Sequence, residues 1–126
     1  MAVTTTLQSN APLVTSIVTD TDTDLTIRDV ASAQSSLYFV EITNPSTTSP
    51  VYVKIFAAAS NTNISTATQH FIQLYCPANT TCYTYVPTGL VVANGIRYYA
   101  STEPGVAGTL TAPATDVTVK FGSTPT

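Results

Sequence analysis

Residues 36–57 read SLYFVEITNPSTTSPVYVKIFA, and this stretch decides the fold class. It holds two runs rich in β-branched and aromatic residues, Ser36–Thr43 and Val51–Ala57, with NPSTTSP between them. Runs of this kind favour the extended backbone of a strand, whereas clusters of Pro, Asn and Ser favour turns. The stretch therefore predicts two β-strands joined by a turn-rich connection.

The second run also indicates how the sheet is covered. Side chains along a strand alternate between its two faces. One face of Val51–Phe56 carries only Val and Ile, while the other carries Tyr52, Lys54 and Phe56. A half-exposed strand is plainly polar on one side. We therefore expect the outer face to be covered too, by a loop, a terminus or a neighbouring chain.

Similar runs recur on both sides of this stretch, and no segment of ten or more residues shows apolar residues at uninterrupted helical spacing. The further predicted strands are Leu13–Thr19, Leu25–Ala31, Ala67–Cys76, Cys82–Val86, Gly95–Ser101 and Asp116–Phe121. About eight short strands predict an all-β fold, an antiparallel β-sandwich or jelly roll. We expect one domain over residues 13–122, an N-terminal arm at 1–12 and a C-terminal tail at 123–126.

The chain carries unusually little charge. Charged residues make up 9% of the 126, against about 25% in a typical soluble domain. The four basic residues form no patch of the kind that a nucleic acid needs, and no apolar run approaches the about 18 residues of a membrane span. We expect no direct nucleic-acid partner and no membrane. A surface of Thr, Ser, Asn and Gln is easily covered by another subunit, because little charge must be desolvated.

The ends and edges of the predicted sheets also favour assembly into a homo-oligomer. Val3–Leu7, within the arm, is suited to add a strand to another subunit. With two lysines in the whole chain, the edge strands have few of the charges that normally guard such edges. Tyrosines favour interfaces. The candidate interface residues are Val3, Leu7, Tyr52, Lys54, Phe56, Tyr98 and Tyr99.

Cys76 and Cys82 flank the turn sequence PANTT between two predicted strands. In a hairpin, opposed residues lie about 4.5–5.5 Å apart at Cα, within disulfide range. A disulfide and a pair of reduced thiols are both compatible with the sequence, because it does not show the redox compartment. Two cysteines and the single His70 do not complete a four-ligand zinc site.

Asp20, Asp22 and Asp24 resemble the opening of a calcium-binding loop. The sixth position of that loop holds Leu where Gly is needed, and the twelfth holds Ala where Glu is needed. The sequence favours an acidic turn between two strands, with a weakly bound cation as the alternative. His70 lies on a predicted strand without an identifiable nucleophile. We expect no catalytic residue, no metal and no cofactor.

A longer pattern resembles small virion proteins of tailed bacteriophages. LYFVEITNPSTTSPVYVKIFAAAS (37–60) matches their strand ending near Asn, here Asn44, followed by a strand reading YVK, here Tyr52–Lys54. IQLYCPANTTCYTYVPTGLVVANGIRYYAST (72–102) and PATDVTVKFG (113–122) are similar to the later strands. The resemblance covers residues 37–122 and does not include the cysteine pair. It implies a β-sandwich component of the virion surface, no enzyme and no cofactor.

Two hypotheses for function follow from this resemblance. The first is a capsid cement or decoration protein: a homo-oligomer, with a trimer favoured, that binds the outside of the phage head and clamps major capsid protein subunits. The alternative is a tail or fibre component that acts as a receptor- or glycan-binding module. Its site would be Tyr98 and Tyr99 with the loop Gly105–Pro113.

Overall fold

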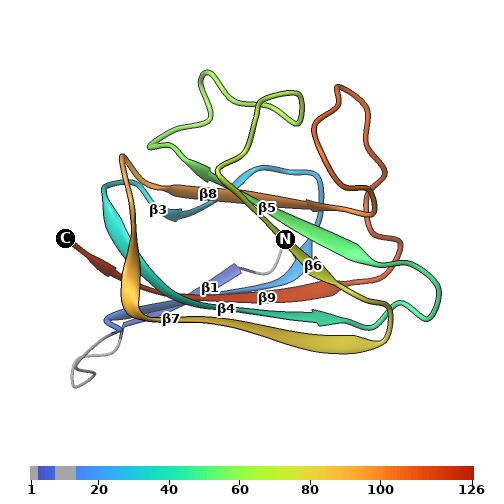
Figure 1. The fold of residues 1–126 in the computed structure, drawn as a ribbon, viewed down its shortest axis with the longest axis horizontal. Coiled ribbons are helices and arrows are strands. Elements are labelled where there is room, and N and C mark those ends of the chain that lie inside the picture. Colours follow the sequence, from blue (N-terminus) through green and yellow to red (C-terminus); the bar gives the residue numbers. More distant parts are fainter. Residues whose placement is uncertain (1–2, 8–13) are drawn as a thin grey trace.

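The computed structural model describes residues 3–7 and 14–126, which form two antiparallel β-sheets packed face to face (Figure 1). The predicted all-β sandwich is confirmed. The strands among these residues are β1 (Val3–Leu7), β2 (Ser16–Thr23), β3 (Arg28–Ala31), β4 (Ser35–Asn44), β5 (Val51–Ala57), β6 (Ile72–Cys76), β7 (Thr80–Val92), β8 (Ile96–Ser101) and β9 (Val117–Pro125).

The strand order is that of a jelly roll. The five-stranded sheet has the order β1-β2-β9-β4-β7, and the four-stranded sheet has the order β3-β8-β5-β6. The pairs β2–β9, β3–β8, β4–β7 and β5–β6 are nested, so that each pair lies within the sequence span of the pair before it. Such nested pairs, distributed over two sheets, are the topology that jelly rolls share. Of the two expected architectures, the structure has the jelly roll.

Inward-facing side chains of both sheets form one apolar core, as the alternation of Val51–Phe56 predicts. The Tyr98 ring of β8 packs against the Phe121 ring of β9 across the sandwich, with 4.5 Å between centroids. The other core residues include Val18, Val40, Ile42, Val51, Val53, Ile55, Ile96, Val117 and Val119.

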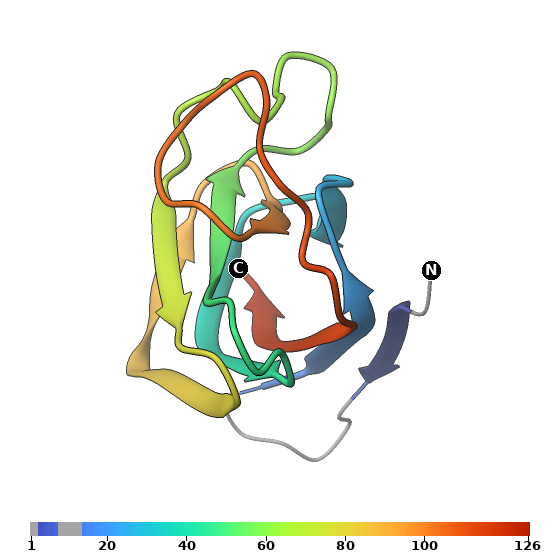
Figure 2. The same cartoon turned by 90° about the vertical axis from the view of Figure 1, so that its right-hand side faces the viewer.

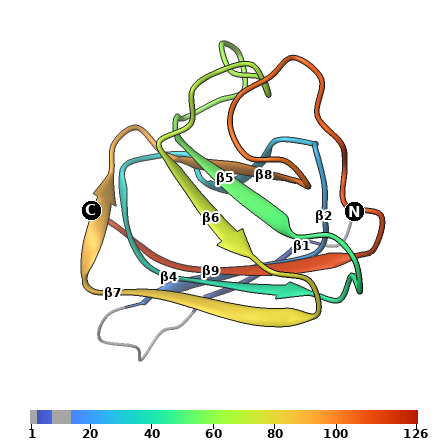
Figure 3. The ribbon, with the colours of Figure 1, turned by 45° about the vertical axis from the view of Figure 1, so that its right-hand side comes forward.

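The hairpin expected between the two cysteines does not form. Cys76 pairs with Val51 of β5 in the four-stranded sheet, whereas Cys82 pairs with Ile42 of β4 in the five-stranded sheet. The residues between them are therefore a corner at which the chain changes sheets (Figure 3). Asn79 supports this corner in a left-handed conformation, with a φ of 53°, and its N–H donates to Ser46 O. The short separation in sequence favoured a hairpin. In the structure, β6 pairs with β5 and β7 pairs with β4, as the nested pairing requires.

The two ends of the chain also differ from expectation. Val3–Leu7 was expected to be available to another subunit, yet it pairs along its length with β2 of its own chain. Residues 1–2 and 8–12 of the expected arm lie outside the described residues. The expected tail at 123–126 continues β9 as far as Pro125, in register with Ser35, and Ser123 is buried. Backbone pairing holds these ends, although their sequences lack a core pattern.

Candidate interaction surface

The outer face of the four-stranded sheet is covered by the chain itself. The loops at 58–71 and 102–116 rise together over this sheet (Figure 2). Lys54 Nζ donates to Gly105 O of the second loop at 2.7 Å, and the Tyr99 hydroxyl donates to Thr66 O of the first at 3.4 Å. The expected cover over the aromatic face of β5 is therefore a pair of loops.

Four of the seven candidate interface residues are buried within the chain itself. Lys54, Phe56 and Tyr99 are buried beneath the loops, and Tyr98 points into the core. The expectation that they contact a partner is wrong in this structure, because their own chain already contacts them. Tyr52 is half-buried beside Tyr75, with 5.2 Å between ring centroids.

Burial also changes the pKa of the Lys54 ammonium. Desolvation lowers the pKa of Lys54, and the nearby Glu103 carboxylate partly opposes this. The ammonium also lies 5.4 Å from the centre of the Tyr99 ring, a favourable cation–π arrangement. Lys54 thus holds the loop at Gly105 against the sheet through its hydrogen bond, and its side chain is not available at the surface.

The outer face of the five-stranded sheet is arranged differently. No other described segment lies over this face in Figures 1 and 3. Tyr83 and Tyr85 of β7 remain 57% and 66% exposed, and their rings stack nearly parallel, with 5.9 Å between centroids. Phe39 of β4 is the register partner of Tyr85, and its ring centroid lies 6.3 Å away. We call Phe39, Tyr83 and Tyr85 the aromatic row.

Alternation along β7 explains why the row faces outward. In CYTYV the tyrosines occupy every second position, so they share a face, while Cys82 packs against the core from the other. Gly122 of β9 pairs with Phe39, and a Cβ there would overlap the Phe39 ring. The glycine therefore lets the aromatic ring lie against the neighbouring strand.

The surroundings of the row are apolar or balanced in charge. Glu41 of β4 pairs in register with Lys120 of β9 on one side and with Tyr83 on the other. The centre of the face therefore carries one acid and one base. An apolar depression of about 310 Å³ adjoins the row, and its lining includes Val14, Tyr38, Val86 and Pro87 in addition to Phe39 and Tyr85.

The three aspartates of DTDTD converge on a guanidinium. Arg28 Nη1 lies 2.6 Å from Asp20 Oδ2 and 3.2 Å from Asp22 Oδ1, and Arg28 Nη2 lies 3.4 Å from Asp24 Oδ1. The Tyr98 hydroxyl also donates to Asp20 Oδ2, at 2.8 Å. The guanidinium occupies the position that a bound cation would take. Within residues 3–7 and 14–126, no cluster of three or more His, Cys, Asp or Glu side chains is suited to hold a metal ion.

His70 lies half-buried just before β6 rather than on a strand. Desolvation, and then repulsion from the Lys54 ammonium, lowers its pKa and favours the neutral imidazole. Its Nδ1 is buried without a hydrogen-bond partner. A general base in a hydrolase would be oriented by such a bond, so the geometry gives His70 no catalytic partner at this nitrogen.

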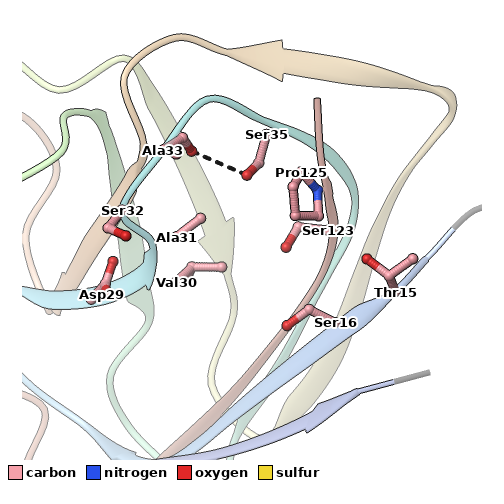
Figure 4. Close-up of a pocket in the computed structure, with 10 residues that line it drawn as sticks. All are labelled: Thr15, Ser16, Asp29, Val30, Ala31, Ser32, Ala33, Ser35, Ser123 and Pro125. Atoms are coloured by element: carbon pink, nitrogen blue, oxygen red, sulfur yellow. Dashed lines mark hydrogen bonds between the residues drawn. The ribbon is translucent and has the colours of Figure 1, made fainter. Parts of the chain in front are cut away.

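A cavity of about 320 Å³ lies at one end of the sandwich (Figure 4). Ser16 and Ser123 line one side, and the segment from Asp29 to Ala33 lines the other. Asp29 is ion-paired with Arg97 at 3.6 Å. Small hydroxyl and methyl groups around a single paired carboxylate do not form a nucleophile and base, so we assign no chemistry to this cavity.

Comparisons with protein-family models, with curated protein sequences and with solved structures give no match for this chain. The part of the chain that the structure describes contains no helix long and apolar enough to cross a membrane. Fold and surface together define a small jelly-roll domain. One of its outer faces is covered by its own loops, and the other presents exposed, stacked aromatic rings.

Proposed function

We propose that this chain is a non-enzymatic structural protein of a tailed-phage virion. It acts as a capsid cement protein that assembles through the outer face of its five-stranded sheet. The observation that carries the proposal is the contrast between the two outer faces: loops cover Phe56 and Tyr99 on one face, whereas Tyr83 and Tyr85 of the aromatic row are exposed on the other. Large exposed aromatics with apolar surroundings are typical of protein interfaces.

The chemistry of this face favours contact with a second copy of the chain. An identical partner presents the same charges, so a face with a large net charge would repel its copy. Glu41 and Lys120 instead give the centre of the face one charge of each sign. With 9% charged residues overall, little charge must be desolvated on assembly. We favour a closed trimer, in which the aromatic rows of three copies meet around the threefold axis.

The assignment to a virion rests on two supports. Residues 37–122 resemble small virion proteins, and the jelly roll is a topology that viral capsid domains use. In the proposed role the oligomer binds the outside of the head and clamps neighbouring major capsid subunits. A tail or fibre is the alternative location.

The glycan-binding site expected at Tyr98 and Tyr99 has no support in the structure. Both side chains are fully buried, and Tyr99 is covered by the loop that includes Thr66. A sugar has no access to either ring without displacement of these loops. We therefore propose a structural role for the chain, without a glycan-binding site at Tyr98 and Tyr99.

A cryo-electron microscopy map of particles that contain the chain tests the proposal. The expected result is density for a jelly roll on the outer surface of the head, in clusters that bring the aromatic rows of neighbouring copies together. Density in the tail would support the alternative location. Absence of the chain from purified particles would contradict the virion assignment.

A further inference from the structure

Cys76 and Cys82 lie on either side of the corner between the two sheets. Cys76 ends β6, Cys82 lies near the start of β7, and Pro77–Thr81 connects them. Both thiols are free. A covalent bond between them would join the two layers of the sandwich at this corner, where β6 and β7 are not paired to each other.

Contacts already direct the Cys76 sulfur toward Cys82. Its thiol donates to Thr80 O at 3.3 Å and to Ile42 O at 3.6 Å. Ile42 is the register partner of Cys82, so the Cys76 sulfur lies against the backbone opposite the other cysteine. Cys82 is close enough to contribute to the raised pKa of the Cys76 thiol. Neither sulfur has to cross the core to reach its counterpart.

We propose that Cys76 and Cys82 form a redox-controlled staple, a dithiol that a small-molecule disulfide converts into an intramolecular disulfide between the two sheets. This inference does not depend on the proposed function. The chain has two cysteines in total, so the alternatives to this bond are intermolecular disulfides or mixed disulfides with the small molecule.

The oxidation has a defined order when oxidised glutathione is the oxidant. The Cys82 thiolate attacks one glutathione sulfur, a protein–glutathione disulfide forms, and one glutathione thiolate leaves. The Cys76 thiolate then attacks the Cys82 sulfur and expels the second glutathione thiolate. The protein loses two electrons and two protons, and one glutathione disulfide becomes two glutathione thiols.

Accessibility decides which cysteine reacts first. Cys82 is half-buried, whereas Cys76 is 0% exposed. Burial above all, then the neighbouring Cys82 side chain, raises the pKa of Cys76 to about 12. Because the thiolate is the nucleophile, the second step is the slow one. We therefore expect the mixed disulfide at Cys82 to accumulate before the staple closes.

Incubation of the native full-length chain with oxidised glutathione tests the proposal, with intact-mass measurement over time. We expect one added glutathione on Cys82, then its loss to give a monomer lighter by two hydrogens, with faster closure at higher pH. Cys76→Ala should stop at the mixed disulfide, and Cys82→Ser should resist the reagent. The closed form should melt several degrees above the reduced form, and a reducing agent should reverse the shift.

Three outcomes would overturn the staple. In the first, the native chain stays reduced or stops at the mixed disulfide while the urea-unfolded chain closes the bond with the same reagent. In the second, oxidation yields only disulfide-linked dimers. In the third, the closed form melts at or below the temperature of the reduced form. Each is read on the wild-type chain, so none depends on the folding of a variant.

Discussion

The Tyr98 hydroxyl of β8 donates a 2.8 Å hydrogen bond to Asp20 Oδ2 of β2, and this bond joins the two sheets inside the sandwich. The same carboxylate oxygen accepts from Arg28 at 2.6 Å. All three residues are buried. A buried charge is costly unless it is paired and hydrogen-bonded, so this network stabilises the fold only while every member is present.

Asp20→Asn should strongly destabilise the chain. The substitution keeps the side-chain shape but removes the charge closest to the buried Arg28 guanidinium. Breaking a buried pair in this way costs about 3–5 kcal/mol. Urea denaturation measures the loss. Asp116→Asn, an exposed carboxylate, is the matched control and should shift stability by no more than about 0.5 kcal/mol. Equal stability of the two variants would contradict the role of the network.

Calcium should leave the thermal stability of the chain unchanged. The Arg28 guanidinium already lies among the carboxylates of Asp20, Asp22 and Asp24, where the calcium-loop interpretation would place the ion. A ligand that binds only the folded state raises the melting temperature by mass action. Thermal scans with added calcium and with a chelator should therefore coincide within replicate scatter. A rise that saturates with calcium concentration would restore the cation site.

Stability should fall as the pH rises above about 10. Burial, followed by the hydrogen bond to Asp20, raises the pKa of Tyr98, and burial also raises the pKa of Tyr99. An unfolded tyrosine loses its proton near pH 10, while the folded ones retain theirs. The unfolded state then binds fewer protons, so these groups give their full stabilisation below pH 10 and lose it above.

Denaturation at a series of alkaline pH values measures this slope. Burial lowers the pKa of Lys54, which acts in the opposite direction just below pH 10.5, so comparison with a variant isolates the tyrosine contribution. Tyr98→Phe should lower stability at pH 7 by about 1–3 kcal/mol, because Asp20 loses a donor. The same variant should show a shallower alkaline decline. An unchanged slope would mean that Tyr98 does not titrate as the buried network requires.

The sequence predicted the strands that follow simple rules and missed the pairings that depend on distant segments. β5 has the predicted bounds, because a proline precedes it and its apolar residues alternate cleanly. The β6–β7 hairpin was wrong, because nested jelly-roll pairing brings together strands far apart in sequence. β1 was also hard to predict. It contains three consecutive threonines and is held by backbone pairing with β2, so its sequence shows little apolar pattern.

The surface was harder to predict than the core. Tyr98 and Tyr99 were placed at an interface because tyrosines favour interfaces, yet adjacent positions on a strand face opposite sides, and here both sides are covered. A usable signal existed in CYTYV, where alternation puts Tyr83 and Tyr85 on the face opposite Cys82. Which of the two sheets the long loops cover is not encoded in any local pattern.

Gly122→Ala should destabilise the chain only while Phe39 is present. A Cβ at Gly122 would overlap the Phe39 ring, which must move or strain the strand. Overpacking of this kind costs about 1–3 kcal/mol. In a Phe39→Ala background the same change should cost little, since the space is then free. A double-mutant cycle by urea denaturation measures the coupling. Additive effects would show that the ring does not lie against Gly122.

Assembly through the aromatic row is tested by sedimentation velocity of the wild-type chain, a Tyr83→Ser/Tyr85→Ser variant and a Tyr75→Ser control. Tyr75 is exposed to a similar degree but lies on the other sheet, so its loss controls for general removal of an exposed ring. We expect the wild type and the control to sediment as an oligomer, with a trimer favoured. The double variant should stay folded and sediment as a 13.2 kDa monomer. A monomeric wild type, or a double variant that assembles as the wild type does, would contradict assembly through the aromatic row.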